Sequence, residues 1–322
     1  MHAIQVTEPG GPEALVWTEV DDPVAGAGML VVDVEAAGVN YIDTYHRSGL
    51  YPVPLPFISG VEGAGTVAEV GDDVEGFAVG DKVAWTGHPG TYAEKARVPA
   101  RVAIVLPDGA STELGAATML QGMTAHFLAC STFPLETGHR CLIHAGAGGV
   151  GLLLIQMAKM RGAEVFTTVG TADKAGLAAG AGADHVINYR EEDFGGAVER
   201  IAGARPLDVI YDGVGADTFE RGLEVLRPRG TMVTFGNASG PVPPMPPLRL
   251  STGGSLFLTR PTLGDHTATR AELEWRADDL FGWIADGRLD VRIGARFPMS
   301  EARAAHEALQ GRATTGKVLL IP

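Results

Sequence analysis

The chain has 322 residues, of which 45% are hydrophobic and 20% charged, and its formal net charge is −14 at pH 7. One hydrophobic core seldom organises a chain of this length, so two domains are expected. No apolar run reaches the roughly 18 to 20 residues that cross a bilayer. The acidic charge also argues against a nucleic-acid partner.

Cysteine content and the N-terminus indicate the compartment. The two cysteines, Cys130 and Cys141, cannot form a disulfide framework and are expected to be inert buried thiols. Residues 1–6 alternate like a strand and lack the basic and apolar regions of a signal peptide. The sequence therefore predicts a cytoplasmic protein.

Short β segments separated by Gly and Pro make up the first hundred residues. Strands are predicted at 30–35, 65–70, 82–85 and 92–98. A helix is expected at 113–130. Beyond residue 140 the pattern changes to strand, Gly-rich turn and helix, with strands at 141–145, 164–169, 185–188, 207–212 and 231–235. This alternation favours an α/β architecture with a parallel sheet covered by helices.

The tail begins with a proline-rich loop at 241–247, followed by a strand at 255–259 and a helix at 272–285. Its last strands, 292–297 and 317–321, flank a helix at 300–310. Short strands of this kind match the first part of the chain. We therefore predict one domain from residues 1–122 and 263–322, with a second domain, 123–262, inserted into it.

A glycine motif follows the strand at 141–145. The segment Gly146-Ala-Gly148-Gly-Val-Gly151 leads into an apolar helix at 152–160. In this context Gly146 permits a tight turn, Gly148 lets the backbone approach a pyrophosphate, and Gly151 allows close helix packing. The motif predicts a Rossmann domain that binds a dinucleotide, and the alternative is a purely structural turn.

The position that distinguishes NAD from NADP lies about 20 residues further on. An NAD site usually has Asp or Glu there, but this chain has Gly170 and Thr171, with Lys174 close behind. A cation favours a 2′-phosphate, so the sequence predicts NADPH. Asp173 lies nearby, and a simply solvated Lys174 is the alternative.

A set of metal ligands is missing. The nine histidines include no pair at metal-ligand spacing, and two cysteines cannot form a four-cysteine site. Cys141 and His144 are three residues apart, but on a core strand. Without a Lewis acid an electron-poor acceptor, such as a quinone or a conjugated enone, is a better substrate than a simple alcohol.

Several longer stretches resemble one family. They are Gly38-Val-Asn-Tyr-Ile-Asp-Thr-Tyr45, Arg47-Ser-Gly-Leu-Tyr-Pro52, Gly146 to Gly151, Val186-Ile-Asn-Tyr-Arg-Glu-Glu192, Phe235-Gly-Asn237 and Thr259-Arg-Pro261. They resemble the zeta-crystallin-like quinone oxidoreductases of the medium-chain dehydrogenase/reductase superfamily. Val61 stands where the zinc-dependent relatives have a metal-binding histidine. The resemblance implies a GroES-like β domain from both chain ends, a six-stranded Rossmann domain, and a cofactor between them.

The resemblance also implies residues that bind the cofactor. Those near the nicotinamide are Asn40, Tyr45, Thr124, Phe235, Asn237 and Phe257, and Val214 is a further residue that binds the cofactor. Gly149 and Val150 join the other motif glycines at the pyrophosphate. The 2′-phosphate would contact Gly170, Thr171, Lys174, Tyr189 and Arg312.

Candidate catalytic residues follow from the same resemblance. Asn40, Asp43, Tyr45 and Tyr51 would share one active-site loop. Tyr51 is either a proton donor or an aromatic residue that lines the site. Gln121 either lies near the substrate or only caps the linking helix or lies at the surface. The loop at 238–250 is either a lid or an ordinary connection.

The leading hypothesis is NADPH-dependent, zinc-independent reduction of quinones. An enone or a 2-enoyl thioester is the alternative substrate, and Arg47, Arg249 and Arg260 keep a coenzyme A thioester open. A non-enzymatic alternative is a crystallin-like structural or RNA-binding role, against which the acidic charge speaks. Relatives imply a homodimer joined through the edge strand at 255–259.

Overall fold

The computed structural model describes all 322 residues, and the chain divides into two compact units. The first contains Met1–Met123, Thr267–Ala285 and Val291–Pro322, and the second contains Thr124–His266 and Asp286–Asp290. The last of these segments differs from the predicted boundaries. It belongs to the second unit because Gln156 and Asp290 exchange two hydrogen bonds, of 3.0 and 2.8 Å.

The first unit is built mainly of antiparallel strands. One sheet has the order β2-β1-β4, and a larger one has the order β15-β16-β3-β5-β6-β8, with β7 also paired to β3. Its strands are β1 (His2–Val6), β2 (Val16–Glu19), β3 (Met29–Val39), β4 (Phe57–Ile58), β5 (Glu62–Val70), β6 (Lys82–Thr86), β7 (Lys95–Pro99), β8 (Ala103–Val105), β15 (Ile293–Pro298) and β16 (Lys317–Ile321). Its helices are α1 (Tyr41–Ser48), α8 (Arg270–Ala285), α9 (Ala302–Gln310) and most of α2 (Thr112–Phe127). The C-terminal strand β16 lies between β15 and β3, so the C-terminal part of the chain completes the sheet that β3 begins.

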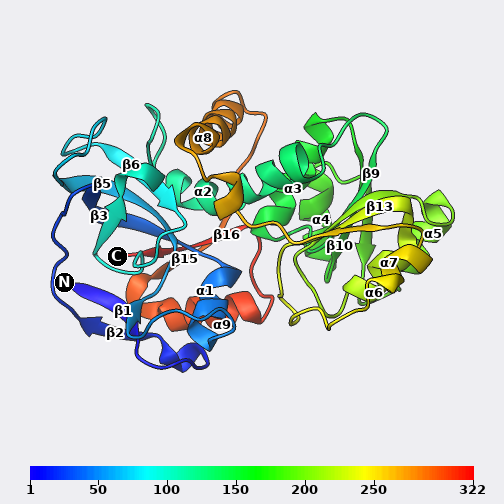
Figure 1. Cartoon of the computed structure of the whole chain (residues 1–322), viewed down its shortest axis with the longest axis horizontal. Helices are drawn as coiled ribbons and strands as arrows, with labels where there is room; N and C mark the ends of the chain where they lie inside the picture. Colours follow the sequence, from blue (N-terminus) through cyan, green and yellow to red (C-terminus); the bar gives the residue numbers. More distant parts are fainter. The chain divides into compact units, whose positions relative to one another are not determined.

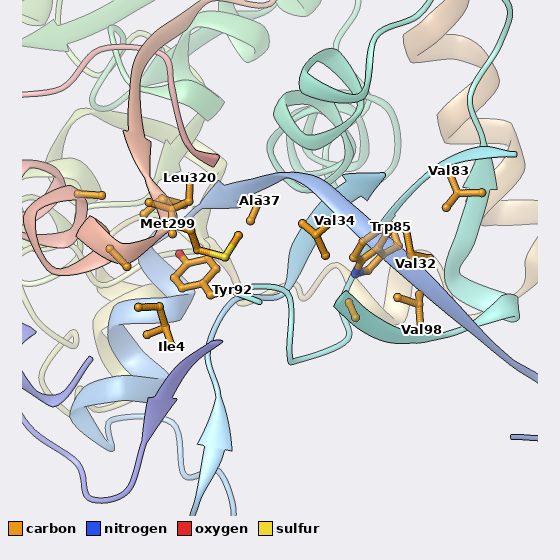
Figure 2. Packing of buried hydrophobic residues seen from close by; sticks show 14 of the residues in the cluster. Ile4, Val32, Val34, Ala37, Val83, Trp85, Tyr92, Val98, Met299 and Leu320 are labelled. Carbon is orange, nitrogen blue, oxygen red and sulfur yellow. The ribbon is translucent and has the colours of Figure 1, made fainter. Parts of the chain in front are cut away.

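Alternating apolar residues of these strands form the core of the first unit. Figure 2 shows Trp85 close to Val34 and Val98, and Tyr92 close to Ile4 and Met299. All six of these residues are buried. Elements from residue 4 to residue 320 therefore share one apolar cluster.

The second unit is a six-stranded parallel sheet with the order β11-β10-β9-β12-β13-β14. The strands are β9 (Arg140–Ile143), β10 (Glu164–Val169), β11 (His185–Asn188), β12 (Leu207–Asp212), β13 (Leu226–Thr234) and β14 (Phe257–Thr259). The helices are α3 (Gly149–Met160), α4 (Ala172–Gly180), α5 (Phe194–Ala202), α6 (Phe219–Val225) and α7 (Leu248–Thr252). Helices α3 and α4 contact each other, as do α5 and α6, and helices cover both faces of the sheet (Figure 1).

This strand order is that of the Rossmann fold, which the sequence predicts. In such a sheet the strand order reverses between β9 and β12, and ligands bind outside the carboxyl ends of the strands near this point. The loops after β9 and β12 therefore mark the expected cofactor site. No helix of the structure is long and apolar enough to cross a membrane.

Three local predictions are wrong. Residues 41–48 form the helix α1 rather than a loop, because the Asp43 carboxylate accepts a hydrogen bond of 2.8 Å from the Asn40 N–H and so caps its N-terminus. Tyr92 precedes strand β7 instead of lying in it. Gln121 lies inside α2, so it does not cap that helix.

We expect the C-terminal strand to be essential for the stability of the first unit. Val318 in β16 is 1% exposed, whereas Val105 in β8 of the same sheet is 42% exposed. Val318→Ala should lower the free energy of unfolding by about 2 kcal/mol, through lost burial and an unfilled cavity. Val105→Ala, the matched control, should change it by less than roughly 0.5 kcal/mol. Equal effects in urea titrations would contradict this packing.

Candidate active site

The glycine turn connects β9 to α3. Gly148 is the N-cap of α3, and a Cβ there would meet only the Ala145 carbonyl oxygen, at 3.2 Å. A Cβ at Gly151 would overlap that same oxygen, and one at Gly146 would overlap the Thr167 hydroxyl. Gly146 and Gly151 therefore permit close packing, and a side chain at Gly148 would press against one carbonyl oxygen. The first N–H groups of α3 lack partners within the helix and can bind an anion.

The ends of β10 and β11 bring together the predicted 2′-phosphate residues of this unit. Thr171 caps α4 and accepts a hydrogen bond from the Lys174 N–H at 3.3 Å. A Cβ at Gly170 would lie 2.6 Å from the Tyr189 hydroxyl oxygen, so Tyr189 lies directly over Gly170. Lys174 is half-buried and Asp173 is exposed. The four predicted residues are therefore neighbours, whereas Arg312 belongs to the other unit.

Further candidates follow the carboxyl ends of β12 and β13. The Val214 N–H donates to Asp212 at 2.7 Å, and a Cβ at Gly213 would lie 3.0 Å from the Phe235 ring. Asn237 comes two residues after Phe235 in the same loop. Val214, Phe235 and Asn237 therefore lie at the same edge of the sheet as the glycine turn.

Phe257 does not lie at this edge. It pairs with Thr231, which pairs with Val209, and Val209 pairs with Cys141 at the start of β9. Thr231 is three residues before the end of β13, roughly 10 Å along the strand. The strand register therefore contradicts the assignment of Phe257 to the nicotinamide pocket.

Arg260, rather than Phe257, comes at the carboxyl end of β14. Its guanidinium donates to the Thr234 hydroxyl and to the Gly236 carbonyl, both at 3.0 Å. From the sequence, Arg260 was considered only as a contact for coenzyme A. Because it follows the last strand of the sheet, the sequence could also have predicted it at the carboxyl edge.

In the first unit, Asn40 lies at the centre of a buried polar network. Its Nδ2 donates to the Gly38 carbonyl at 3.1 Å and to Glu62 Oε2 at 2.8 Å. Its Oδ1 accepts from Lys317 Nζ at 2.9 Å and from Gln121 Nε2 at 3.1 Å. Lys317 also forms an ion pair with Glu62, and both side chains are at most 1% exposed.

The structure thus brings Asn40 and Gln121 together, as predicted residues of one site. Glu62 and Lys317 belong to the same network, although the sequence did not predict them as site residues. A lysine at the start of the apolar strand sequence Lys-Val-Leu-Leu-Ile was the available signal, because buried lysines require a partner.

Helix α1 carries the other predicted catalytic residues of this segment. Tyr45 is buried, and its ring packs against Tyr51 edge to face, with 5.2 Å between centroids. The Tyr51 N–H also donates to the Tyr45 carbonyl at 3.1 Å. Tyr51 is only half-buried and lies just after the helix, so these two aromatic residues form one group.

Asp43 lies on the buried side of α1. Its carboxylate accepts from the Tyr92 hydroxyl at 2.8 Å, in addition to the Asn40 N–H. Burial raises the pKa of Asp43 to about 7, although both hydrogen bonds act to lower it. Since the side chain is 0% exposed, Asp43 supports α1 and does not reach a ligand.

A histidine extends this chain of hydrogen bonds. Nδ1 of His306 lies 3.2 Å from Arg47, which can only donate, so Nδ1 accepts and Nε2 carries the proton. Nε2 lies 3.3 Å from the Tyr92 hydroxyl. Burial and the Arg47 cation lower the pKa of His306 to about 3, and its neutral form fits this arrangement.

Nowhere in the structure do three or more His, Cys, Asp or Glu side chains form a group that could hold a metal ion. Cys141 is fully buried, and burial raises the pKa of its thiol. Burial also lowers the pKa of His144, which lies 2.9 Å from the Thr168 hydroxyl. Cys130 is half-buried and reduced.

Thr124, a predicted cofactor residue, is buried in the last turn of α2, in the second unit.

Two family descriptions match the chain. The one for the alcohol dehydrogenase GroES-like domain matches residues 26–108, and the one for zinc-binding dehydrogenases matches residues 149–277. Together they define a class of dehydrogenases and reductases that combine a GroES-like domain with a nucleotide-binding domain.

Individual relatives narrow this class. The chain is 45% identical to the quinone oxidoreductase of Salmonella typhimurium, over 99% of both chains. It superimposes on the Escherichia coli quinone oxidoreductase, solved in complex with NADPH, with a TM-score of 0.97 and 43% identity over 100% of both chains. It is 39% identical to the 2-haloacrylate reductase of a Burkholderia species, over 99% of this chain and 98% of that protein.

The chain belongs to the quinone oxidoreductase family of the medium-chain dehydrogenase/reductase superfamily. The family and the fold class predicted from the sequence are thereby confirmed.

Asp43 makes stability depend on pH. Its pKa of about 7 exceeds the ordinary value of 3.8, so from about pH 4 to pH 7 the folded chain holds a proton that the unfolded chain has released. The contribution of Asp43 to the free energy of unfolding therefore falls as the pH rises through that window. Asp43→Asn cannot ionise, so its Tm should fall less than that of the wild type between about pH 5 and pH 8. Parallel Tm profiles would contradict this, and Asp33→Asn, at an exposed position of β3, is the control.

Proposed function

We propose that the chain reduces quinones by hydride transfer from NADPH and needs no metal ion. The glycine turn before α3 carries this proposal, because the first N–H groups of that helix have no partners within it and can bind a pyrophosphate. The relative from Escherichia coli that is solved with NADPH has the same fold over its whole length.

The residues of the second unit fit such a coenzyme. The backbone N–H groups of Gly149 and Val150 would hold the pyrophosphate. Lys174 and Tyr189 would hold the 2′-phosphate, since a cation and a hydroxyl favour that group over a bare ribose. When bound, NADPH supplies the hydride equivalent.

The residues of the first unit would position the acceptor. Gln121, held in place by Asn40, offers an ordered amide, and Tyr45 and Tyr51 offer an aromatic group with phenol donors. A phenol or a bound water could supply a proton to the quinone oxygen as negative charge develops there. Because a quinone is already electron-poor, such positioning suffices without a Lewis acid.

Conjugated acids or enones remain a second class of substrate, favoured by the 2-haloacrylate reductase relative. A coenzyme A thioester is less favoured, because the three arginines considered for it already have partners. Arg47 is buried and donates to the Gly10 carbonyl and to Gln310, and Arg249 pairs with Glu220. Arg260 donates to the loop after β13.

We further propose a cytoplasmic homodimer. The edge strand β14 leaves Phe257 60% and Leu258 38% exposed, and a second copy could cover them by pairing edge to edge. Neither Cys130 nor Cys141 forms a disulfide, as suits a reducing compartment. The net charge of −14 disfavours the alternative RNA-binding role.

A panel of acceptors tests the proposed reaction. With NADPH, we expect faster oxidation of the coenzyme by benzoquinone and phenanthrenequinone than by 2-chloroacrylate or crotonyl thioester, followed by nicotinamide absorbance. Dialysis against EDTA should leave the rates unchanged, because no ligand cluster for a metal is present. Faster turnover of 2-chloroacrylate would favour the second class of substrate. Absence of turnover with every acceptor would favour a structural role.

Lys174→Ala tests coenzyme choice. Loss of a charge-assisted contact to the 2′-phosphate should raise the KM for NADPH roughly tenfold to hundredfold, with little change for NADH. Lys82→Ala, at an exposed position of the first unit, is the matched control. Equal changes for both coenzymes would remove the role of Lys174.

A further inference from the structure

The orientation of the buried amides around Asn40 follows from donor and acceptor rules. The Lys317 ammonium can only donate, so the Asn40 atom that faces it must be the oxygen Oδ1. Both protons of Nδ2 then point to the Gly38 carbonyl and to Glu62. Since Oδ1 can only accept, the Gln121 atom that faces it must be the amide nitrogen.

This order leaves one acceptor without a partner. Gln121 Oε1 is buried and has no hydrogen-bond partner within the protein. Every polar atom of the Asn40 amide is satisfied, so Asn40 itself offers nothing further to a ligand. A buried carbonyl oxygen without a donor is costly and is expected to receive one when a ligand binds.

The same ion pair also fixes the backbone that carries Gln121. Glu62 Oε1 accepts from the Leu120 N–H at 2.6 Å, directly before Gln121 in α2. Gly38 makes room for this arrangement, because a Cβ there would overlap Glu62, the Ala116 carbonyl oxygen and the Lys317 side chain. Lys317 and Glu62 thus determine both the position and the orientation of the Gln121 amide.

We propose that Lys317 and Glu62 are positioning residues that turn Gln121 Oε1 toward a ligand group that donates a hydrogen bond. Two groups of the proposed reaction have this chemistry: the carboxamide NH2 of the nicotinamide and the hydroxyl that forms on the quinone. The identity of these ligands rests on the proposed function.

Gln121→Met tests the acceptor, because methionine keeps the length and helix preference of the side chain without its oxygen. We would measure the Kd of NADPH, the Kd of the reduced acetylpyridine analogue, whose methyl ketone cannot donate, and kcat with benzoquinone. If the carboxamide is the donor, NADPH binds roughly tenfold more weakly and the analogue binds as before. If the forming hydroxyl is the donor, kcat falls roughly tenfold and both Kd values stay unchanged.

The control is Thr118→Val, which removes a buried hydroxyl from the same helix outside the network and should leave all three values unchanged. Equal weakening of NADPH and its analogue by Gln121→Met would indicate lost packing and overturn the proposal. Unchanged values would also overturn it. A wild type that neither binds NADPH nor reduces benzoquinone would instead reject the proposed function.

Coupling to the ion pair is tested by Lys317→Met combined with Glu62→Gln, which leaves no unpaired charge in the interior. This variant should show the same loss as Gln121→Met, and adding Gln121→Met to it should cause no further loss. Additive losses would show that Lys317 and Glu62 do not act through Gln121. Where the combined variant does not fold, Gln121→Met still decides the role of the acceptor.

Discussion

The ion pair between Lys317 and Glu62 is the interaction on which the order of the first unit depends. Its partners are 255 residues apart in the sequence, and both are almost completely excluded from solvent. Removing two charges from water costs several kcal/mol for each, and their attraction offsets this only when their other hydrogen-bonding groups are satisfied. Asn40 and the Leu120 N–H provide that satisfaction. The ion pair can therefore be buried only while Asn40 and the Leu120 N–H keep their positions in the candidate site.

A second series of buried hydrogen bonds holds the segment around Asn40 from the other side. Arg47 donates to His306, His306 donates to Tyr92, and Tyr92 donates to the Asp43 carboxylate, which also accepts from the Asn40 N–H. The side chain of Asn40 is thus fixed from β16, and its backbone is fixed through Tyr92 and α9. Each of the two hydrogen-bond chains contains one residue from the C-terminal part of the sequence, Lys317 in one and His306 in the other. A segment held at two points by the tail changes little in position when a ligand arrives, which lowers the entropy cost of ordering the site.

The sequence predicted best what local patterns determine. In the second unit, the predicted strands 164–169, 185–188 and 207–212 agree with β10, β11 and β12, because each is an apolar run bounded by turn residues. Gly170, Lys174 and Tyr189 are neighbours because parallel strands end at the same edge of the sheet. Phe257 was misplaced because the register of an edge strand depends on pairing and not on its own composition.

The buried networks could not be predicted in this way. Asp43 and Tyr45 lie in one short helix, yet only the fold decides that Asp43 faces Tyr92, which in turn contacts His306. The contacts of Lys317 and of Arg47 with His306 span more than 250 residues and leave no periodic pattern. Such pairs are visible in a sequence only as charged residues in apolar surroundings, which is a weak signal.

Glu62 also shows why a metal ion would find no ligand here. In the motif shared with zinc-dependent relatives this glutamate remains, while Val61 replaces the histidine before it and is 5% exposed. Both oxygens of Glu62 already accept hydrogen bonds from Leu120, Asn40 and Lys317. The carboxylate would have to leave a buried cation unpaired in order to bind a metal, at a cost of several kcal/mol. In this chain the motif serves to orient amides, and the substrate must bring the electron deficiency that a Lewis acid would otherwise provide.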